Sequence, residues 1–183
     1  MSKLQHFKVS LTCVCLLALP TAYAANISKA DYTAGKARIS TTYKADRSAC
    51  DSQSANAKDV CVQEAKAKEK VALAELEYSH TGKPADRNKI FVARAESAYA
   101  VAKERCDDLA GNAKDVCVKE AKAVELKALA DAKMGKEIGD ARQDAAAEKL
   151  DADYKVAIEK CDALAGDAKN NCVAAAKTRF GKN

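Results

Sequence analysis

The stretch CDDLAGNAKDVC, residues 106–117, decides the fold, because related versions of it occur three times in a chain of 183 residues. Ten residues also separate Cys50 from Cys61 and Cys161 from Cys172. The text around these pairs repeats with a period of 55 or 56 residues. A fixed period of this size indicates one supersecondary unit that is used three times.

Each copy is typical of two helices joined by a tight turn. Gly111 follows a segment of strong helix formers, and glycine commonly ends a helix because it adopts the left-handed conformation without steric cost. Asn112 then stands where a helix N-cap belongs, and Asp115 lies in the first turn, near the positive end of the helix dipole. Cys106 precedes the glycine by five residues and Cys117 follows it by six. The two cysteines should therefore lie at similar heights on antiparallel helices.

Small and apolar residues predict the faces on which these helices meet. Steps of four, three and four residues away from the second cysteine pair give Ala102, Tyr99 and Ala95 on one side and Ala121, Val124 and Ala128 on the other. Residues at this spacing share one face of a helix. The first unit has Asp46 and Lys68 on its stripe, so we expect its hairpin to be wetter and looser.

A zinc site is the alternative to a disulfide for paired cysteines. Zinc sites usually place two to four residues between ligands and need four ligands, and a spacing of ten with no histidine nearby fits them badly. A disulfide across each pair would stabilise its hairpin by roughly 3 kcal/mol. The sequence thus predicts no metal site and three disulfides, formed by Cys50, Cys61, Cys106, Cys117, Cys161 and Cys172.

Residues 1–24 have the features of a secretory signal peptide. Lys3 and Lys8 precede a short apolar run, and the segment ends in an Ala-x-Ala pattern that predicts cleavage between Ala24 and Ala25. The apolar run is short for a bilayer span, and we expect no transmembrane segment after cleavage. The two cysteines inside the signal leave with it, and the remaining six form an even set. Export and paired cysteines both point to an oxidising compartment.

The composition argues for helices with a thin core. From residue 25 onward the chain has 37 alanines but only 25 residues of Val, Ile, Leu, Met and Phe. Alanine, lysine, glutamate and arginine form helices well, which predicts an all-α fold, and disulfides supplement a thin core. After loss of Lys3 and Lys8, 29 basic residues are mixed with 26 acidic ones. We expect no nucleic-acid partner, because that requires a clustered basic face.

The predicted architecture is three tandem disulfide-stapled helical hairpins, elongated or loosely bundled. We expect six helices, two in each unit. Thr81-Gly82-Lys83-Pro84 should separate the first two units, and Gly135 and Gly139 should separate the second from the third. The expected domains are the signal peptide 1–24, the hairpin repeats 25–82 and 83–137, and a truncated third repeat, 138–183.

The chain offers few groups for catalysis. His80 is the only histidine after the signal, and it lacks a nucleophile pattern or an evident partner, so we expect an exposed turn residue. Glu64 and Lys68 exemplify acids and bases at helical spacing, which predicts solvated ion pairs along one helix. No Gly-rich phosphate loop, Cys-x-x-Cys pair or Cys-x-x-Cys-His haem motif occurs. We expect neither an enzyme nor a cofactor.

Aromatic and apolar residues are the remaining candidates for a binding site or a contact between units. A tyrosine stands seven residues before the first cysteine of each pair, at Tyr43, Tyr99 and Tyr154. These rings could form a ligand-binding ladder, but their place on the inward stripes favours core packing. Ile90, Phe91 and Val92 form the largest apolar cluster after the signal, and we expect it to be the main contact between the first two units.

Two nearly identical strings, Ala-Lys-Asp-Val-Cys-Val-x-Glu-Ala-Lys at 57–66 and 113–122, support a family resemblance. With the signal segment, they resemble the small exported Ala/Lys-rich proteins of Gram-negative bacteria described as TolA-like or cell-envelope-biogenesis proteins. The resemblance covers most of the chain after residue 24. It implies a soluble periplasmic protein.

Three functions are compatible with these observations. The first is a structural or interaction protein of the cell envelope, which binds an envelope protein or a second copy of itself. The second is a stress protectant that coats membranes or unfolding proteins, although a chain acting through disorder has little use for three disulfides. The third, a small-molecule or metal-binding module, rests only on the tyrosines and cysteines.

Overall fold

The computed structural model describes residues 26–182, which form five α-helices and two short 3₁₀ turns without a β-strand. The helices are α1 (Lys29–Ala49), α2 (Ala55–Thr81), α3 (Pro84–Arg105), α4 (Gly111–Asp162) and α5 (Gly166–Arg179). The 3₁₀ turns, Cys50–Ser52 and Cys106–Asp108, follow α1 and α3. The all-α prediction is confirmed. The predicted signal peptide and its cleavage site, Ala24 and Ala25, lie outside the described residues.

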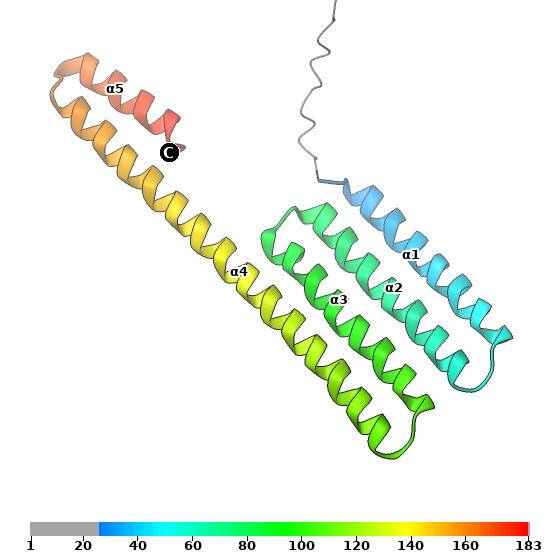
Figure 1. The fold of residues 1–183 in the computed structure, drawn as a ribbon. Helices are drawn as coiled ribbons and strands as arrows, with labels where there is room; N and C mark the ends of the chain where they lie inside the picture. Colours follow the sequence, from blue (N-terminus) through cyan, green and yellow to red (C-terminus); the bar gives the residue numbers. More distant parts are fainter. Residues whose placement is uncertain (1–25, 183) are drawn as a thin grey trace, which may run out of the picture.

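The helices form an open row rather than a closed bundle (Figure 1). Each helix packs chiefly against the helices that precede and follow it in the sequence, α1 on α2, α2 on α3, α3 on α4 and α4 on α5. The antiparallel helices α1, α2, α3 and the first half of α4 lie side by side, with α1 at one edge and α4 at the other. The molecule is therefore elongated, and most helices are covered on only part of their surface.

The expected break between the second and third units does not occur. Gly135 and Gly139 lie inside α4, a single helix of 52 residues that is about 78 Å long at 1.5 Å per residue. A helical glycine costs only about 1 kcal/mol relative to alanine. The surrounding residues form helices well, and i,i+4 ion pairs such as Lys136–Asp140 bracket the glycines. Five helices result, instead of six.

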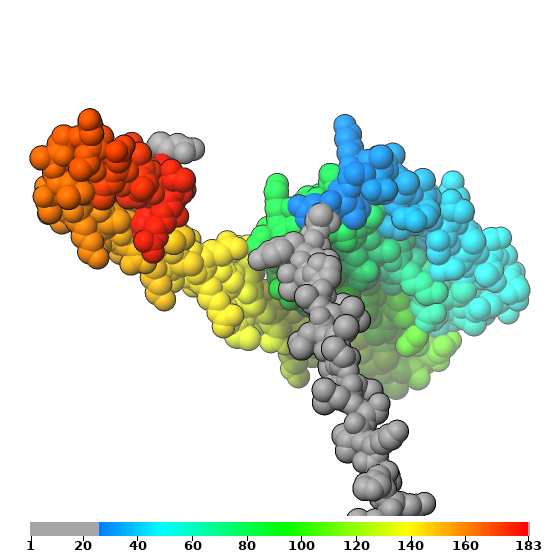
Figure 2. All heavy atoms as spheres, turned by 90° about the horizontal axis from the view of Figure 1, so that it is seen from above, coloured from blue at the N-terminus to red at the C-terminus, as the bar shows by residue number. Residues whose placement is uncertain are grey.

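The middle of α4 bridges the two parts of the molecule. All ten residues of 141–150 are exposed. Figure 2 shows this yellow stretch as a narrow connection between the row of helices that ends with the first half of α4 and the C-terminal hairpin. Such a helix draws its stability from its own backbone hydrogen bonds and from the strong helix formers in its sequence.

The three predicted disulfides are confirmed, Cys50–Cys61, Cys106–Cys117 and Cys161–Cys172. Their Cα atoms lie 5.6, 5.7 and 5.6 Å apart, so each bond joins two helices beside a hairpin tip. The first cysteine of each pair is at most 1% exposed, and these three are the largest fully buried side chains. The disulfides thus form the buried part of each hairpin near its tip.

The turn chemistry differs from the prediction in one respect. Gly111 does adopt the left-handed conformation, with φ of 56°, but it opens α4 rather than ending the preceding helix. That helix already ends at Arg105, before the 3₁₀ turn, and the N-cap of α4 is Ala110 instead of Asn112. Gly166 has the same conformation in the third hairpin, with φ of 57°.

The predicted inward stripe of α4 is wrong at one position. Val124 is 63% exposed, whereas the neighbouring Glu125 is 7% exposed. The inward face follows a heptad-like spacing in which residue 125, seven after 118 and seven before 132, is central. Glu125 tolerates burial because Lys122 donates a hydrogen bond to its carboxylate, at 2.5 Å.

Ion pairs join helices within the first unit and between the first two units. The two charged residues on its stripe pair with each other across the hairpin, Lys68 Nζ to Asp46 Oδ2 at 3.2 Å. Glu64 binds Arg105 on α3 at 2.5 Å. The predicted pairing of Glu64 with Lys68 along one helix is therefore wrong, because both side chains have partners on neighbouring helices.

No helix among residues 26–182 has both the length and the apolar character needed to cross a membrane.

The hairpin tips predict a stabilising substitution. Ala55 occupies the position of Gly111 and Gly166, and it too has a left-handed backbone, with φ of 50°. That conformation costs a residue with a Cβ roughly 1–2 kcal/mol. Glycine has more conformational freedom in the unfolded chain, which costs only ~0.4–1 kcal/mol of stability. Ala55→Gly should raise the free energy of unfolding in urea by about 0.5–1 kcal/mol.

The matched control is Gly111→Ala, because a Cβ there would meet nothing within 4 Å and only the backbone conformation is tested. Gly111→Ala should lower the stability by about 1 kcal/mol. An unchanged or lower stability of Ala55→Gly would contradict the left-handed conformation at residue 55.

Candidate docking groove between α3 and α4

The repeated tyrosines do not come together as one site. Tyr43, Tyr99 and Tyr154 are half-buried and belong to α1, α3 and the far end of α4, in three different hairpins. Lys122 Nζ lies 4.8 Å from the centre of the Tyr99 ring. Phe180 packs edge-on against Tyr154, with ring centres 6.0 Å apart. Tyr99 and Tyr154 thus contact residues of their own hairpins, and Tyr43 lines a hollow between α1 and α2.

His80 is half-buried rather than exposed. Its ring stacks on Tyr32 with the ring centres 4.7 Å apart, and its Nδ1 lies 2.9 Å from the carbonyl oxygen of Ile27. The Tyr32 hydroxyl donates a hydrogen bond to Glu77 at 2.6 Å, which raises the pKa of Tyr32. These contacts fasten the segment that leads into α1 to the end of α2. The pairing depends on the tertiary fold, since 48 residues separate the two rings.

Asp86 organises the turn between α2 and α3. Its side chain is 8% exposed, accepts a hydrogen bond from the Thr81 hydroxyl at 2.6 Å and pairs with Lys89 at 2.8 Å. The bond from Lys89, then that from Thr81, holds the pKa of Asp86 below its ordinary value of 3.8. The carboxylate therefore joins the first two units in its charged form.

The turn predicts a pH dependence. Because the folded-state pKa of Asp86 lies below the unfolded value, its carboxylate stabilises the fold above about pH 3.8, and this stabilisation is lost as the pH falls through the depressed value. Asp86→Asn should lower stability at neutral pH. The difference from the natural protein should shrink as the pH falls below 3.8, measured by urea unfolding. A difference that stays constant with pH would contradict this role.

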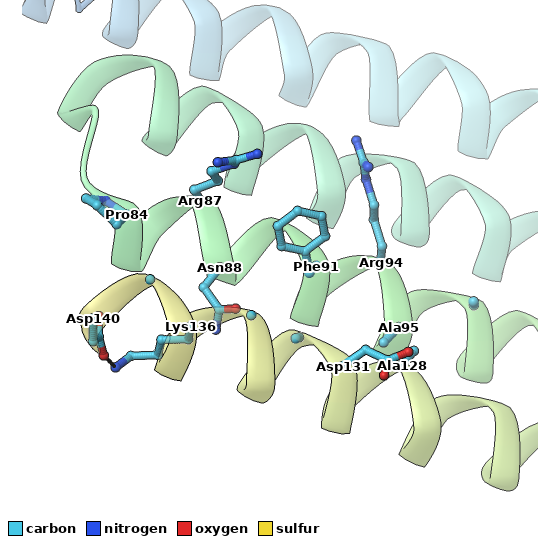
Figure 3. Close-up of a pocket in the computed structure, with 14 residues that line it drawn as sticks. Pro84, Arg87, Asn88, Phe91, Arg94, Ala95, Ala128, Asp131, Lys136 and Asp140 are labelled. Atoms are coloured by element: carbon cyan, nitrogen blue, oxygen red, sulfur yellow. Dashed lines mark hydrogen bonds and ion pairs between the residues drawn. The ribbon is translucent and has the colours of Figure 1, made fainter. Parts of the chain in front are cut away.

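A shallow groove of about 710 Å³ lies between α3 and α4. Its lining residues include Arg87, Asn88, Phe91, Ala128, Asp131, Ala132, Gly135 and Gly139. Figure 3 shows Arg87, Phe91 and Arg94 projecting from one side of α3, and Asn88 extending toward α4 beside Lys136.

The floor of the groove is apolar and is formed by small side chains. Ala128, Ala132, Gly135 and Gly139 follow each other at spacings of four, three and four residues, so they form one smooth stripe on α4. Phe91 stands beside this stripe with 46% of its surface exposed. Side chains this small allow a second backbone to approach closely, and the ring supplies apolar contact area.

Charged side chains border the apolar floor. Lys136 donates a hydrogen bond to Asp140 at 2.5 Å, which raises the pKa of the lysine. Arg94 lies across the rim and pairs with Glu75 on α2 at 2.6 Å. An apolar floor with charged borders suits an amphipathic segment.

The role of Phe91 differs from the sequence prediction. Ile90 is 9% exposed and shares its helical face with Asp86, Ala93 and Ser97, which are also buried. That face meets α2, so Ile90 does form part of the contact between the first two units. Phe91 is the next residue along α3 and therefore points to a different face. The buried residues of α3 recur with the period of a helix, and Phe91 does not belong to that series.

Among residues 26–182, no group of three or more His, Cys, Asp or Glu side chains is arranged to hold a metal ion. No protein-family model, curated protein or solved structure matches the chain.

Proposed function

We propose that this protein is a non-enzymatic structural or interaction protein of the bacterial cell envelope, which presents a row of helices to a protein partner. The observation that carries the proposal is the distribution of large apolar residues. In the described part of the chain, Ile90 is the only large aliphatic or aromatic residue that is buried, whereas eleven are exposed. A chain that exposes its apolar side chains along an open row has much more surface for binding than core.

The compartment is argued from the disulfides. Three disulfides are typical of proteins from oxidising environments. The predicted signal peptide over residues 1–24 and the resemblance to exported Ala/Lys-rich proteins extend this to the periplasm of a Gram-negative bacterium.

The groove between α3 and α4 is the proposed docking place for an envelope protein. Its apolar floor of small residues, with Phe91 beside it, fits an amphipathic helix whose apolar side rests on the floor. Arg87 stands at the border and favours an acidic flank on that helix. The repeat positions the groove, since the disulfide of the second hairpin fixes α3 against α4.

Crosslinking in intact cells tests the proposal. Affinity recovery after crosslinking should yield one or two envelope proteins, and their crosslinked residues should lie around the groove. Phe91→Asp should reduce that recovery at least tenfold, because a central apolar contact of an interface typically contributes about 2 kcal/mol.

Leu126→Asp is the matched control, because Leu126 is 55% exposed on α4 and does not line the groove. It should leave recovery unchanged. Recovery of a broad and unspecific set of proteins, with equal amounts in both variants, would contradict the proposal and favour a general protectant.

A further inference from the structure

The contact between α2 and α3 provides a template for a second interface. Glu64 on α2 binds Arg105 on α3 at 2.5 Å, and Glu75 binds Arg94 at 2.6 Å. At the hairpin tip, Asn56 Nδ2 donates a hydrogen bond to the Glu104 carbonyl oxygen at 3.1 Å. These polar contacts join the second helix of one hairpin to the first helix of the next.

The same polar residues recur one repeat later. Counted from the cysteines, Glu64 and Glu75 correspond to Glu120 and Asp131, and Asn56 corresponds to Asn112. On the other side, Arg94 and Arg105 correspond to Lys149 and Lys160. Both charge types are kept at these two pairs, whereas the third ion pair of the first interface, Lys70–Glu96, corresponds to Leu126 and Asp151 and is not kept.

Within one chain the acidic residues of this second set cannot reach the lysines. They belong to one uninterrupted helix, in which 18 residues separate Asp131 from Lys149, about 27 Å along the axis. Glu120 and Lys160 are about 60 Å apart by the same measure. In residues 26–182, none of these four side chains takes part in an ion pair.

All four charges are exposed and lie on one face of α4, the outer face, and Asp131 at its border also lines the groove between α3 and α4. At 100° per residue they fall within an arc of roughly 40°. Met134, Ile138 and Val156 lie on or beside this arc and are 55%, 47% and 54% exposed. Helices α3 and α5 both lie on the same side of α4 (Figure 1), and the four charged residues of the outer face are exposed.

We propose that a second copy of this chain covers the outer face, with the two α4 helices packed antiparallel about a two-fold axis. Glu120 then pairs with Lys160 of the partner subunit, and Asp131 pairs with Lys149 of the partner subunit. In both pairs the two residue numbers average 140, so one two-fold axis near residue 140 relates both contacts. Each contact therefore occurs twice, as a symmetric dimer requires.

A third pair supports the antiparallel register. Val71 and Ala98 both line the hollow between α2 and α3. Their counterparts one repeat later are Lys127 and Asp153, which are opposite in charge and again centred on position 140. An apolar pair has thus been replaced by a complementary charged pair. A parallel arrangement would instead place like charges together.

This inference rests on the proposed role as an interaction protein and names one partner. It is tested on the purified oxidised protein alone, whereas the proposed envelope partner is tested in cells. A protein that is monomeric in solution would overturn the dimer and leave the recovery of envelope proteins unaffected.

The experiment mixes equal amounts of ¹⁵N-labelled and unlabelled protein and joins contacting carboxylates and lysines with a carbodiimide. Light scattering should show a dimer. Mass spectrometry should show crosslinks between Asp131 and Lys149 and between Glu120 and Lys160, with one peptide of each isotope. A monomer, or crosslinks only between peptides of the same isotope, would overturn the proposal.

Charge reversal tests the register. Asp131→Lys should raise the dissociation constant of the dimer about tenfold, because two attractive contacts become repulsive. Adding Lys149→Glu to the same chain should restore the dimer. Asp144→Lys makes the same charge change off the outer face and should leave the dissociation constant unchanged. Failure of the double variant to recover would overturn the proposed pairing.

A hinge variant tests the origin of the interface. Gly139 corresponds to Pro84, the first residue of α3 after the turn between the first two units. Gly139→Pro should break α4 there and let the third hairpin fold back on its own chain. The variant should be monomeric, and the crosslink between Asp131 and Lys149 should now join peptides of the same isotope. Absence of this crosslink from both proteins would overturn the equivalence of the two interfaces.

Discussion

The disulfide across each hairpin tip is the constraint on which the rest of the structure depends. The first cysteines of the pairs are the largest fully buried side chains, and most of the other buried apolar residues are alanines. A core of this kind contributes little burial energy, since burial scales with apolar area. Each disulfide contributes roughly 3 kcal/mol. Three together match the whole stability of an ordinary domain, about 5–15 kcal/mol.

Local closure of the hairpins explains the open architecture. Because each hairpin is held at its own tip, the units need not enclose a common core, and they pack in a row in which α1 and α4 remain edges. Polar contacts such as Asp86 with Thr81 and Glu64 with Arg105 then set the angle and register between neighbours. The result is a long surface with apolar hollows and matched charges, which suits binding.

Much of the fold could be predicted from the cysteine spacing, because ten intervening residues leave room for one turn between two helices. The continuity of α4 could not, since Gly135 and Gly139 resemble a helix end in sequence and only the absence of proline separates them from the turn at Pro84. The burial of Glu125 depends on Lys122, and the exposure of Phe91 depends on which face of α3 meets α2. These features arise from tertiary packing, which a single pattern of spacings does not encode.

The most direct test of this account compares the oxidised protein with the fully reduced and alkylated protein by circular dichroism during urea titration. The account predicts cooperative unfolding of the oxidised form and loss of most helix and all cooperativity in the reduced form at 25 °C, because the alanine-rich contacts alone do not offset chain entropy. A reduced protein that keeps its helix content and its unfolding midpoint would contradict it. Stability would then reside in the helix contacts, and the disulfides would be accessory.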